Sequence, residues 1–461
     1  MPAIITKDFR IHNARQFQES FSEAADTYYL AIGRPQAFAD NQAFNDGTDT
    51  SPPTPVDDVG QVEYYAYDDL LSAKKIASSD TTLAIPRRDW TTGTTYDYYR
   101  HDYGDINTAG ATITSNSNAT TLYDSTFYVV NSSFDVFVCI DNDGDTASTT
   151  EPTTKQAAIF STADGYKWKY MYSLTSSEQA NFLSTDFMHV STESTDYSTV
   201  GGAIENVKVT AGGASGTNGT YTNVAIRGDG TGGVCTVVIA ANAVSSVTVT
   251  TAGTGYTFAS VLAANIGSVV GADIDFIISP PGGHATDVVA ELGGFYVMTN
   301  TNFTQTESGE FNTDNDFRRV VLIRNPIDSD SSATATESTL DCTKSVTFAA
   351  GAGTFVADEK ITQSSSGAIG YVIDYNSTTR VLRYIQPQFA NQGIDSNGTL
   401  TAFTGTDTVT GATSSATGTP TSHDTTPELQ HDSGDILYIE NRKPVTRASD
   451  QTENVKLIVE F

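Results

Sequence analysis

The segment from about 201 to 283 contains two similar runs in which β-branched and polar residues alternate. Residues 204–210 and 244–250 form these runs, and each leads through glycines to a tyrosine followed by threonine, at Tyr221 and Tyr256. The offset of about forty residues is typical of repeated β-units. Alternation with a period of two suits strands and not helices. The segment therefore predicts a small β-domain of tandem strands.

Short runs of the same kind fill much of the remaining chain. Charged residues make up only 17% of it, and Thr, Ser and Gly are abundant beside 22 Tyr and 22 Phe, a composition that favours strands joined by turns. Helices are expected only near Asn13–Glu23, with Asn13 as a cap, and Asp57–Lys75. The clearest strand-like runs are residues 27–32, 134–140, 166–174, 317–323, 436–439 and 455–459.

The length of 461 residues allows about three domains. Composition changes near Ser198 and at Pro280–Gly283, a Ser/Ala/Thr tract at 329–339 is typical of a linker, and 410–426 has low complexity. We predict a mainly β, multidomain protein with a β-sandwich-like core, a few N-terminal helices and two inserted β-rich domains. The predicted parts are the core at 1–200, 284–339 and 427–461, an inserted β-repeat domain at 201–283, and a second inserted domain at 340–426 with a mobile, low-complexity end.

The charge balance argues against two classes of partner. The chain has 55 acidic and 25 basic residues, a formal net charge of −30. Such a field repels nucleic acid and anionic membranes, so neither is expected as a partner; the simplest role of the acidity is solubility. No apolar run reaches the roughly 20 residues of a membrane helix. Residues 1–10 lack the pattern of a signal peptide.

The three cysteines, Cys139, Cys235 and Cys342, are too few and too scattered for a disulfide framework. Each lies beside strand-like residues, so we expect buried, reduced thiols and folding in a reducing cytoplasm.

An acidic segment is the best candidate for a metal site. Asp141, Asp143 and Asp145 have the spacing that begins a calcium loop. The sixth position is Thr146 where glycine is required, and the twelfth is Pro152 where glutamate is required. An acidic turn after a strand is the favoured interpretation, and whether these aspartates bind an ion stays open.

Other motifs give no support for catalysis or a cofactor. Residues 228–233 match G-x-G-x-x-G, but a strand-like run at 234–239 follows where a dinucleotide site needs a helix. The six histidines lack zinc-site spacing, and no G-x-S-x-G sequence occurs. The sequence selects no carboxylate pair for glycoside hydrolysis. We expect no catalytic residues, no metal and no cofactor.

Two clusters of basic and aromatic residues are candidates for an assembly interface. Arginine forks beside aromatic rings suit binding to an acidic partner, and internal ion pairing within this acidic chain is an equally good explanation. The candidates are Arg87, Arg88, Trp90, Tyr438, Glu440, Asn441 and Arg442.

Four stretches, taken in order, resemble a known family. They are 85–90 (Ile-Pro-Arg-Arg-Asp-Trp), 164–170 (Asp-Gly-Tyr-Lys-Trp-Lys-Tyr), 316–326 (beginning Asp-Phe-Arg-Arg and ending Asn-Pro) and the C-terminal stretch from His431 to Phe461. The family is the baseplate wedge subunit, gene product eight, of T-even-type contractile-tailed bacteriophages. The resemblance covers about 1–200, 285–330 and 427–461. The two inserts depart from it, and Lys443 interrupts an expected Arg-Pro-Pro run.

The resemblance implies a β-rich structural subunit without catalysis or cofactor. It implies a homodimer in each wedge of the tail baseplate, in contact with neighbouring wedge proteins and with proteins that attach the fibres. Such a subunit would be assembled in the host cytoplasm and would pass on the rearrangement that triggers sheath contraction. The inserts would decorate the outside of the plate.

Two other functions are weighed beside this one. A tail-associated host-receptor or carbohydrate-binding protein could use Tyr221 and Tyr256 as platforms for sugars, and such fibre proteins usually form trimers. A polysaccharide-degrading enzyme would need paired carboxylates in a cleft.

Overall fold

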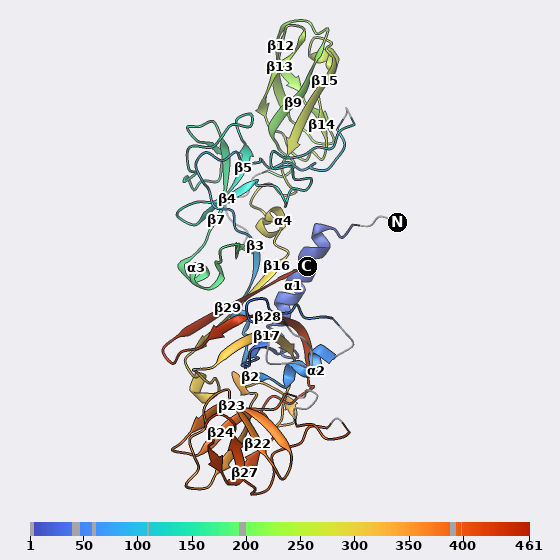
Figure 1. The fold of residues 1–461 in the computed structure, drawn as a ribbon. Helices are drawn as coiled ribbons and strands as arrows, with labels where there is room; N and C mark the ends of the chain where they lie inside the picture. Colours follow the sequence, from blue (N-terminus) through green and yellow to red (C-terminus); the bar gives the residue numbers. More distant parts are fainter. Residues whose placement is uncertain are drawn as a thin grey trace. The chain divides into compact units, whose positions relative to one another are not determined.

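The computed structural model describes residues 4–38, 47–57, 61–107, 110–192, 200–387, 393–397 and 399–461. The chain divides into two compact units. The first contains Met1–Phe17, Thr82–Met298 and Ile458–Phe461, and the second contains Gln18–Thr81 and Thr299–Leu457. Antiparallel strands dominate both units, so the predicted mainly β, multidomain fold is confirmed (Figure 1). The described helices are α1 (Lys7–Ser20), α2 (Gln61–Tyr67), α3 (Ser176–Phe182) and α4 (Val288–Leu292).

A four-stranded sheet in the first unit is covered by side chains on both faces. Alternate residues of one strand enter different clusters: Val136 and Val138 pack with Met171, whereas Phe137 and Cys139 pack with Trp168. Since successive side chains of a strand point to opposite faces, this explains the unbroken apolar run in the sequence. The sheet order is β4 (Tyr128–Val130), β5 (Asp135–Asp141), β7 (Lys167–Ser173) and β6 (Phe160–Ser161).

A second four-stranded sheet has the order β29-β16-β3-β8. Within the first unit, β3 (Thr81–Pro86) pairs with β8 (Phe187–His189), with Ile85 opposite Met188. The other two strands, β16 (Tyr296–Thr304) and β29 (Thr452–Glu460), pass from one unit into the other along the chain.

The segment with the two similar runs forms strands with their own apolar cluster. The runs lie in β9 (Ile204–Ala214) and β13 (Ala243–Thr251). Strand β9 pairs with β15 (Val270–Ile278), and Ile204 lies opposite Ile278, so the two ends of the segment are neighbours. Figure 1 shows these strands gathered together. The remaining strands are β10 (Gly219–Ala225), β12 (Val234–Ala240), β11 (Arg227–Gly228) and β14 (Ala259–Ser260).

The second unit is built on a five-stranded antiparallel sheet. Its central strand β1 is buried at all six positions, because β2 and β17 flank it and apolar residues cover it. The sheet order is β20 (Thr339–Asp341), β2 (Leu70–Lys75), β1 (Tyr28–Gly33), β17 (Asp316–Arg324) and β28 (Asp435–Thr446).

Seven strands between Lys344 and Asp424 form a sheet around a separate apolar cluster that includes Phe348 and Tyr384. Its order is β26 (Thr417–Gly418), β25 (Val409–Gly411), β22 (Lys360–Gln363), β23 (Ala368–Asn376), β24 (Val381–Ile385), β21 (Lys344–Phe348) and β27 (Pro420–Asp424). The division into two compact units groups this sheet with the five-stranded sheet, and it groups 201–283 with the first unit. The predicted domain boundaries stay a prediction.

Both predicted N-terminal helices need correction. The first begins at Lys7 and not at Asn13, and the backbone amide of Phe9 donates to Thr6 Oγ1 at 3.4 Å. In the second, the described helical residues are Gln61–Tyr67, and the apolar residues Leu70 and Leu71 belong to β2. Their spacing suited a helix face, but pairing with β1 takes the segment into the sheet.

Two tracts expected to lack structure contain strands. The predicted linker at 329–339 includes β19 (Ala333–Thr334), which pairs with β18 (Ile327–Asp328). The low-complexity tract at 410–426 contributes to three strands of the seven-stranded sheet. Local composition gave a wrong prediction in both places because it does not reveal the strands with which these segments pair.

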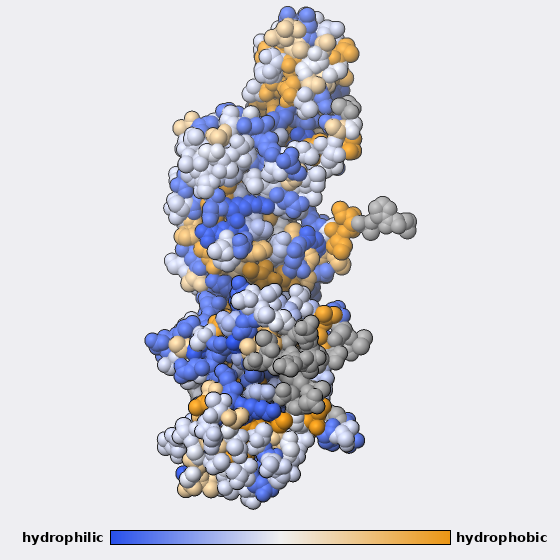
Figure 2. All heavy atoms as spheres, in the orientation of Figure 1, coloured by the Kyte–Doolittle hydropathy of each residue, from blue (hydrophilic) through white to orange (hydrophobic). Residues whose placement is uncertain are grey.

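The described surface is mostly polar. Figure 2 shows hydrophilic residues over much of the visible face, with small separate hydrophobic patches. All three cysteines are buried and free, as predicted, and burial raises the pKa of each thiol. Among the described residues, no helix has the length and apolar character needed to span a membrane.

A buried ionic group joins parts of the first unit. His284 is 1% exposed, its Nδ1 bonds Glu291, and its Nε2 lies 2.9 Å from Glu205 Oε2. The ring of Tyr99 lies edge-on to the imidazole, and Lys169 adds a nearby positive charge. Burial lowers the pKa of His284, but attraction to the two glutamates outweighs it and raises the pKa to about 10. The protonated imidazole therefore holds two carboxylates that would otherwise repel each other.

Replacing Trp168 tests how much the side chains that cover one face of the sheet containing β5 and β7 contribute to stability. Trp168 is fully buried and stacks on Tyr166 with ring centres 5.5 Å apart. Trp168→Ala should lower the free energy of unfolding by about 3–5 kcal/mol, because a large cavity replaces the ring. Urea unfolding followed by circular dichroism measures this. Trp90→Ala, at a half-buried position of the same residue type, should cost clearly less; equal losses would contradict the difference in burial.

Removing the buried imidazole tests the ionic group. His284→Gln removes the cation that directly contacts Glu205 and Glu291 and should cost about 3–5 kcal/mol at pH 7. Because the folded-state pKa is raised, the stabilisation is complete below the ordinary pKa of 6.5 and is lost as pH rises through about 10. The difference from wild type should therefore shrink between about pH 6.5 and pH 10 in denaturant unfolding. His12→Gln, at an exposed position, should show no such trend, and a constant difference for His284→Gln would refute the account.

Candidate functional site

Two predicted interface residues, Arg87 and Trp90, form hydrogen bonds within the first unit. Arg87 Nε lies 2.8 Å from Asp89 Oδ1, and Arg87 Nη1 donates to the carbonyl of Ser184 at 2.9 Å. The indole Nε1 of Trp90 donates to Ser148 Oγ at 3.1 Å, and its ring packs against the cluster around Trp168. The contact between Arg87 and Asp89 is an internal ion pair, the alternative explanation for this cluster in the sequence.

Arg88, between Arg87 and Trp90 in the sequence, has one side-chain nitrogen without a hydrogen-bond partner. Its Nη2 donates to the carbonyl of Tyr123 at 2.7 Å, and its guanidinium lies 4.4 Å from the ring centre of Tyr128. Its Nη1 is buried without a hydrogen-bond partner. Among the described residues, no carboxylate lies within 4 Å of this guanidinium. Arg88 is thus held in place by the fold, and no described carboxylate pairs with its charge.

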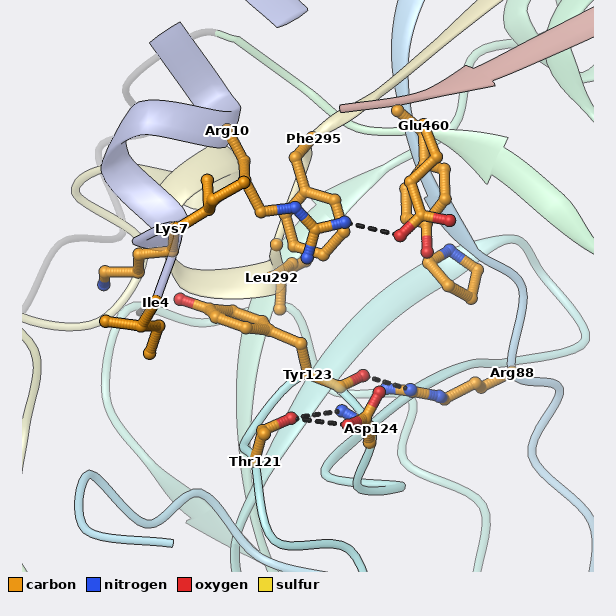
Figure 3. Close-up of a pocket in the computed structure, with 14 residues that line it drawn as sticks. Ile4, Lys7, Arg10, Arg88, Thr121, Tyr123, Asp124, Leu292, Phe295 and Glu460 are labelled. Atoms are coloured by element: carbon orange, nitrogen blue, oxygen red, sulfur yellow. Dashed lines mark hydrogen bonds and ion pairs between the residues drawn. The ribbon is translucent and has the colours of Figure 1, made fainter. Parts of the chain in front are cut away.

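Arg88 lines a pocket of about 440 Å³ in the first unit. In Figure 3, Arg10 of α1 lies over the ring of Phe295 and reaches Glu460, while Tyr123 extends between Ile4 and Arg88. The ring of Tyr123 meets Phe295 edge-on, and its hydroxyl donates to the carbonyl of Ala290 at 3.0 Å. The lining residues are Ile4, Ile5, Lys7, Arg10, Pro86, Arg88, Thr121, Tyr123, Asp124, Leu292, Gly293, Phe295, Tyr296 and Glu460.

The end of α4 shapes the pocket. Gly293 has φ of 78°, in the left-handed region that glycine adopts at little cost, and it ends the helix. A Cβ at this position would lie 2.5 Å from the Tyr123 ring. Glycine therefore both stops the helix and lets Tyr123 pack close to it. The resulting pocket combines apolar rings with three basic side chains and two acidic ones, Asp124 and Glu460, which suits non-covalent recognition.

The second predicted group lies on β28 in the second unit. Tyr438, Glu440 and Arg442 alternate with Asn441, so they point to the opposite face of the strand. The hydroxyl of Tyr438 donates to Glu440 Oε2 at 3.1 Å, and burial raises the pKa of Tyr438 to about 12. Asn441 is engaged internally, accepting from Arg319 Nε at 3.0 Å. Strand β28 is an edge of its sheet, which leaves its half-buried outer face next to unpaired backbone groups.

The acidic segment is tied into the first unit by other groups. Asp141 Oδ1 lies 3.0 Å from Lys208 Nζ, and Asp141 Oδ2 lies 3.0 Å from Lys167 Nζ. Burial raises the pKa of Asp141, but the two lysines outweigh burial and lower the pKa below its ordinary value. Asp145 accepts from Asn116 and Asn142. In the described part of the chain, no three acidic, histidine or cysteine side chains are placed to hold a metal ion.

The proposed sugar platform at Tyr256 needs correction. Its side chain is 3% exposed, its hydroxyl donates to the carbonyl of Ile226 at 3.1 Å, and the amide of Gly233 donates to the same hydroxyl. Tyr256 is therefore a core residue, and no sugar can stack on its ring.

Sequence reasoning missed most of the pocket. Lys7 and Arg10 lie on a short helix without an obvious functional pattern, and Tyr123 and Phe295 are 172 positions apart in the chain. Only the pair Ile4-Ile5 ahead of a polar helix offered a signal, because apolar residues at such a place are not needed for an internal helix face.

Comparison with known proteins gives one family. The family model described as "Bacteriophage T4, Gp8" matches residues 3–197 and 392–461, which together are more than half of the chain. Residues 198–391 lie outside the match, including the stretch at 316–326 that resembled the family in sequence. No curated protein matches the chain. The matched residues include 85–90, 164–170 and the whole C-terminal stretch, and the chain therefore belongs to the Bacteriophage T4 Gp8 family of phage baseplate structural proteins.

Proposed function

We propose that the chain is a structural subunit of the baseplate wedge that joins neighbouring wedge proteins and passes on the rearrangement that triggers sheath contraction. The observation that carries this proposal is the family match over residues 3–197 and 392–461. Within the proposal, the subunit is a homodimer, is assembled in the host cytoplasm, and contacts proteins that attach the fibres. It acts by binding and carries out no reaction.

The packing of each unit supports a mechanical role. In the first unit, side chains cover both faces of the sheet that contains β5 and β7. In the second, β1 lies buried between β2 and β17. Close-packed interiors of this kind resist compression and transmit strain instead of absorbing it. A displacement applied to one surface of such a unit would therefore move its other surfaces with it.

The proposed interfaces follow from the candidate residues. On the first unit, the interface contains Arg88 and the pocket that it lines, with Arg87 and Trp90 holding this region from within. On the second unit, it contains the β28 face with Tyr438, Glu440 and Arg442. Charged side chains and Pro444 on β28 oppose pairing with a foreign strand, so this edge would bind through side chains. Asn441 supports β28 from the other face.

The buried position of Tyr256 weighs against the receptor-binding alternative, which relied on that ring. An adhesin would need another aromatic platform, and Tyr221 is only half-buried but donates its hydroxyl to the carbonyl of Thr217 at 2.9 Å. The wedge function is therefore the one that the geometry supports better.

Gold labelling of intact virions tests the proposal. An antibody against residues 1–200 should label the rim of the baseplate in both extended and contracted tails, because a wedge subunit stays in the plate throughout contraction. The same antibody absorbed with purified chain is the matched control. Label along the fibres or at their tips would contradict the wedge function and favour an adhesin. If intact particles show no label, immunoblotting of denatured particles decides whether the chain is present.

A further inference from the structure

Three apolar side chains at the start of α1 are unusually exposed. Ile4 is 86% exposed, Ile5 is 69% exposed and Phe9 is 55% exposed, all within six residues. With Lys7 they form what we call the N-terminal patch. Figure 2 shows hydrophobic atoms gathered at this end of α1. Single exposed apolar residues are common on proteins, but a contiguous group marks a surface that another molecule covers.

The patch continues into the pocket beside it. Ile4, Ile5 and Lys7 belong to both, and the pocket adds the rings of Tyr123 and Phe295 (Figure 3). Its volume of about 440 Å³ is near the lower end of the range for ligand pockets. A few side chains of an extended segment fill such a space, whereas a whole domain surface does not enter it.

Two cations beside the apolar surface lack an ion pair with any described residue. In the described part of the chain, no carboxylate lies within 4 Å of Lys7 or Arg88, whereas Arg10 next to them pairs with Glu460 at 2.5 Å. The chain has 55 acidic residues for 25 basic ones, so carboxylates are plentiful. Cations left unpaired in such a chain, next to exposed apolar groups, are complementary to a carboxylate from outside.

We propose that the N-terminal patch and its pocket are the docking site for an acidic segment of a different baseplate protein. This segment places an aliphatic or aromatic side chain in the pocket and separate carboxylates against Lys7 and Arg88. The inference rests on the proposed function. A second copy of the chain is a poorer occupant, because a two-fold interface through the patch would bring Lys7 and Arg88 of both copies together. The net charge of −30 makes nucleic acid a poorer occupant too.

Photo-crosslinking in assembled particles tests the occupant. Virions carrying p-benzoylphenylalanine in place of Phe9 are irradiated, and cross-linked peptides are identified by mass spectrometry. The expected product joins position 9 to a segment of another baseplate protein that has an apolar residue next to Asp or Glu. The same photoreactive residue in place of Phe258, which is 61% exposed and lies outside the patch, is the matched control and should not reach that segment.

A charge swap then tests the recognition. Lys7→Glu should weaken binding of a synthetic peptide with the cross-linked sequence by about tenfold, and exchange of the peptide's carboxylate residue that faces Lys7 for lysine should restore it. Arg227→Glu, at another exposed basic position, should leave binding unchanged. Because Lys7 is exposed, its replacement leaves the core intact.

The outcomes separate the docking site from the wedge function. Particles that contain the chain but give no product from position 9, or products only with a second copy, overturn the docking site and leave the wedge function standing. Binding that is insensitive to Lys7→Glu also overturns the docking site. Absence of the chain from particles overturns both.

Discussion

Pairing of β1 with β2 on one side and β17 on the other holds the second unit together. Strand β17 lies nearly 300 residues from β1 in the chain, with Tyr28 opposite Arg324. All six residues of β1 are buried, and each large apolar side chain that is buried contributes about 1.5–3 kcal/mol. The sheet gathers strands from the N-terminal, middle and C-terminal parts of the chain. Long segments between those strands are tolerated because they leave and return without interrupting a ladder.

Acidic side chains far outnumber basic ones in this chain. The chain has a net charge of −30, and many of its arginines and lysines form internal ion pairs, as Arg447 does with Glu453 at 2.8 Å in the second unit. A basic residue that the fold holds but does not pair, such as Arg88, is then an informative exception. In the proposed function, this residue contributes to recognition of a partner.

The sequence predicted strands better than it predicted their partners. The run around Val136–Ile140 and the C-terminal strands were found because β-branched and aromatic residues mark them locally. Leu70 and Leu71 were placed in a helix because nothing near them reveals β1 as their neighbour. Composition also failed at 410–426, where a threonine-rich tract completes a sheet whose other strands precede it.

The candidate site shows the same limit. Family resemblance and residue type brought out Arg87, Arg88 and Trp90 together, but only the contacts show that Arg87 and Trp90 are satisfied within the fold and that Arg88 is not. The pocket beside Arg88 requires Tyr123 and Phe295 to meet across a long separation in the chain, which no local pattern encodes. The burial of Tyr256 was equally hidden, because a tyrosine after glycine suits both a surface loop and a turn over a core.

The paired strands β9 and β15 give residues 201–283 an attachment of a particular mechanical kind. A segment joined by two separate flexible linkers would rotate freely. This segment is instead attached through β9 and β15, which are hydrogen-bonded to each other. Lys208 and Asp275 on these strands are further fastened to Asp141 and Arg100. Displacement of the part of this segment that lies away from Asp141 and Arg100 would therefore require the paired strands β9 and β15 to bend. A force on these strands would therefore act on β5 through the ion pair between Lys208 and Asp141.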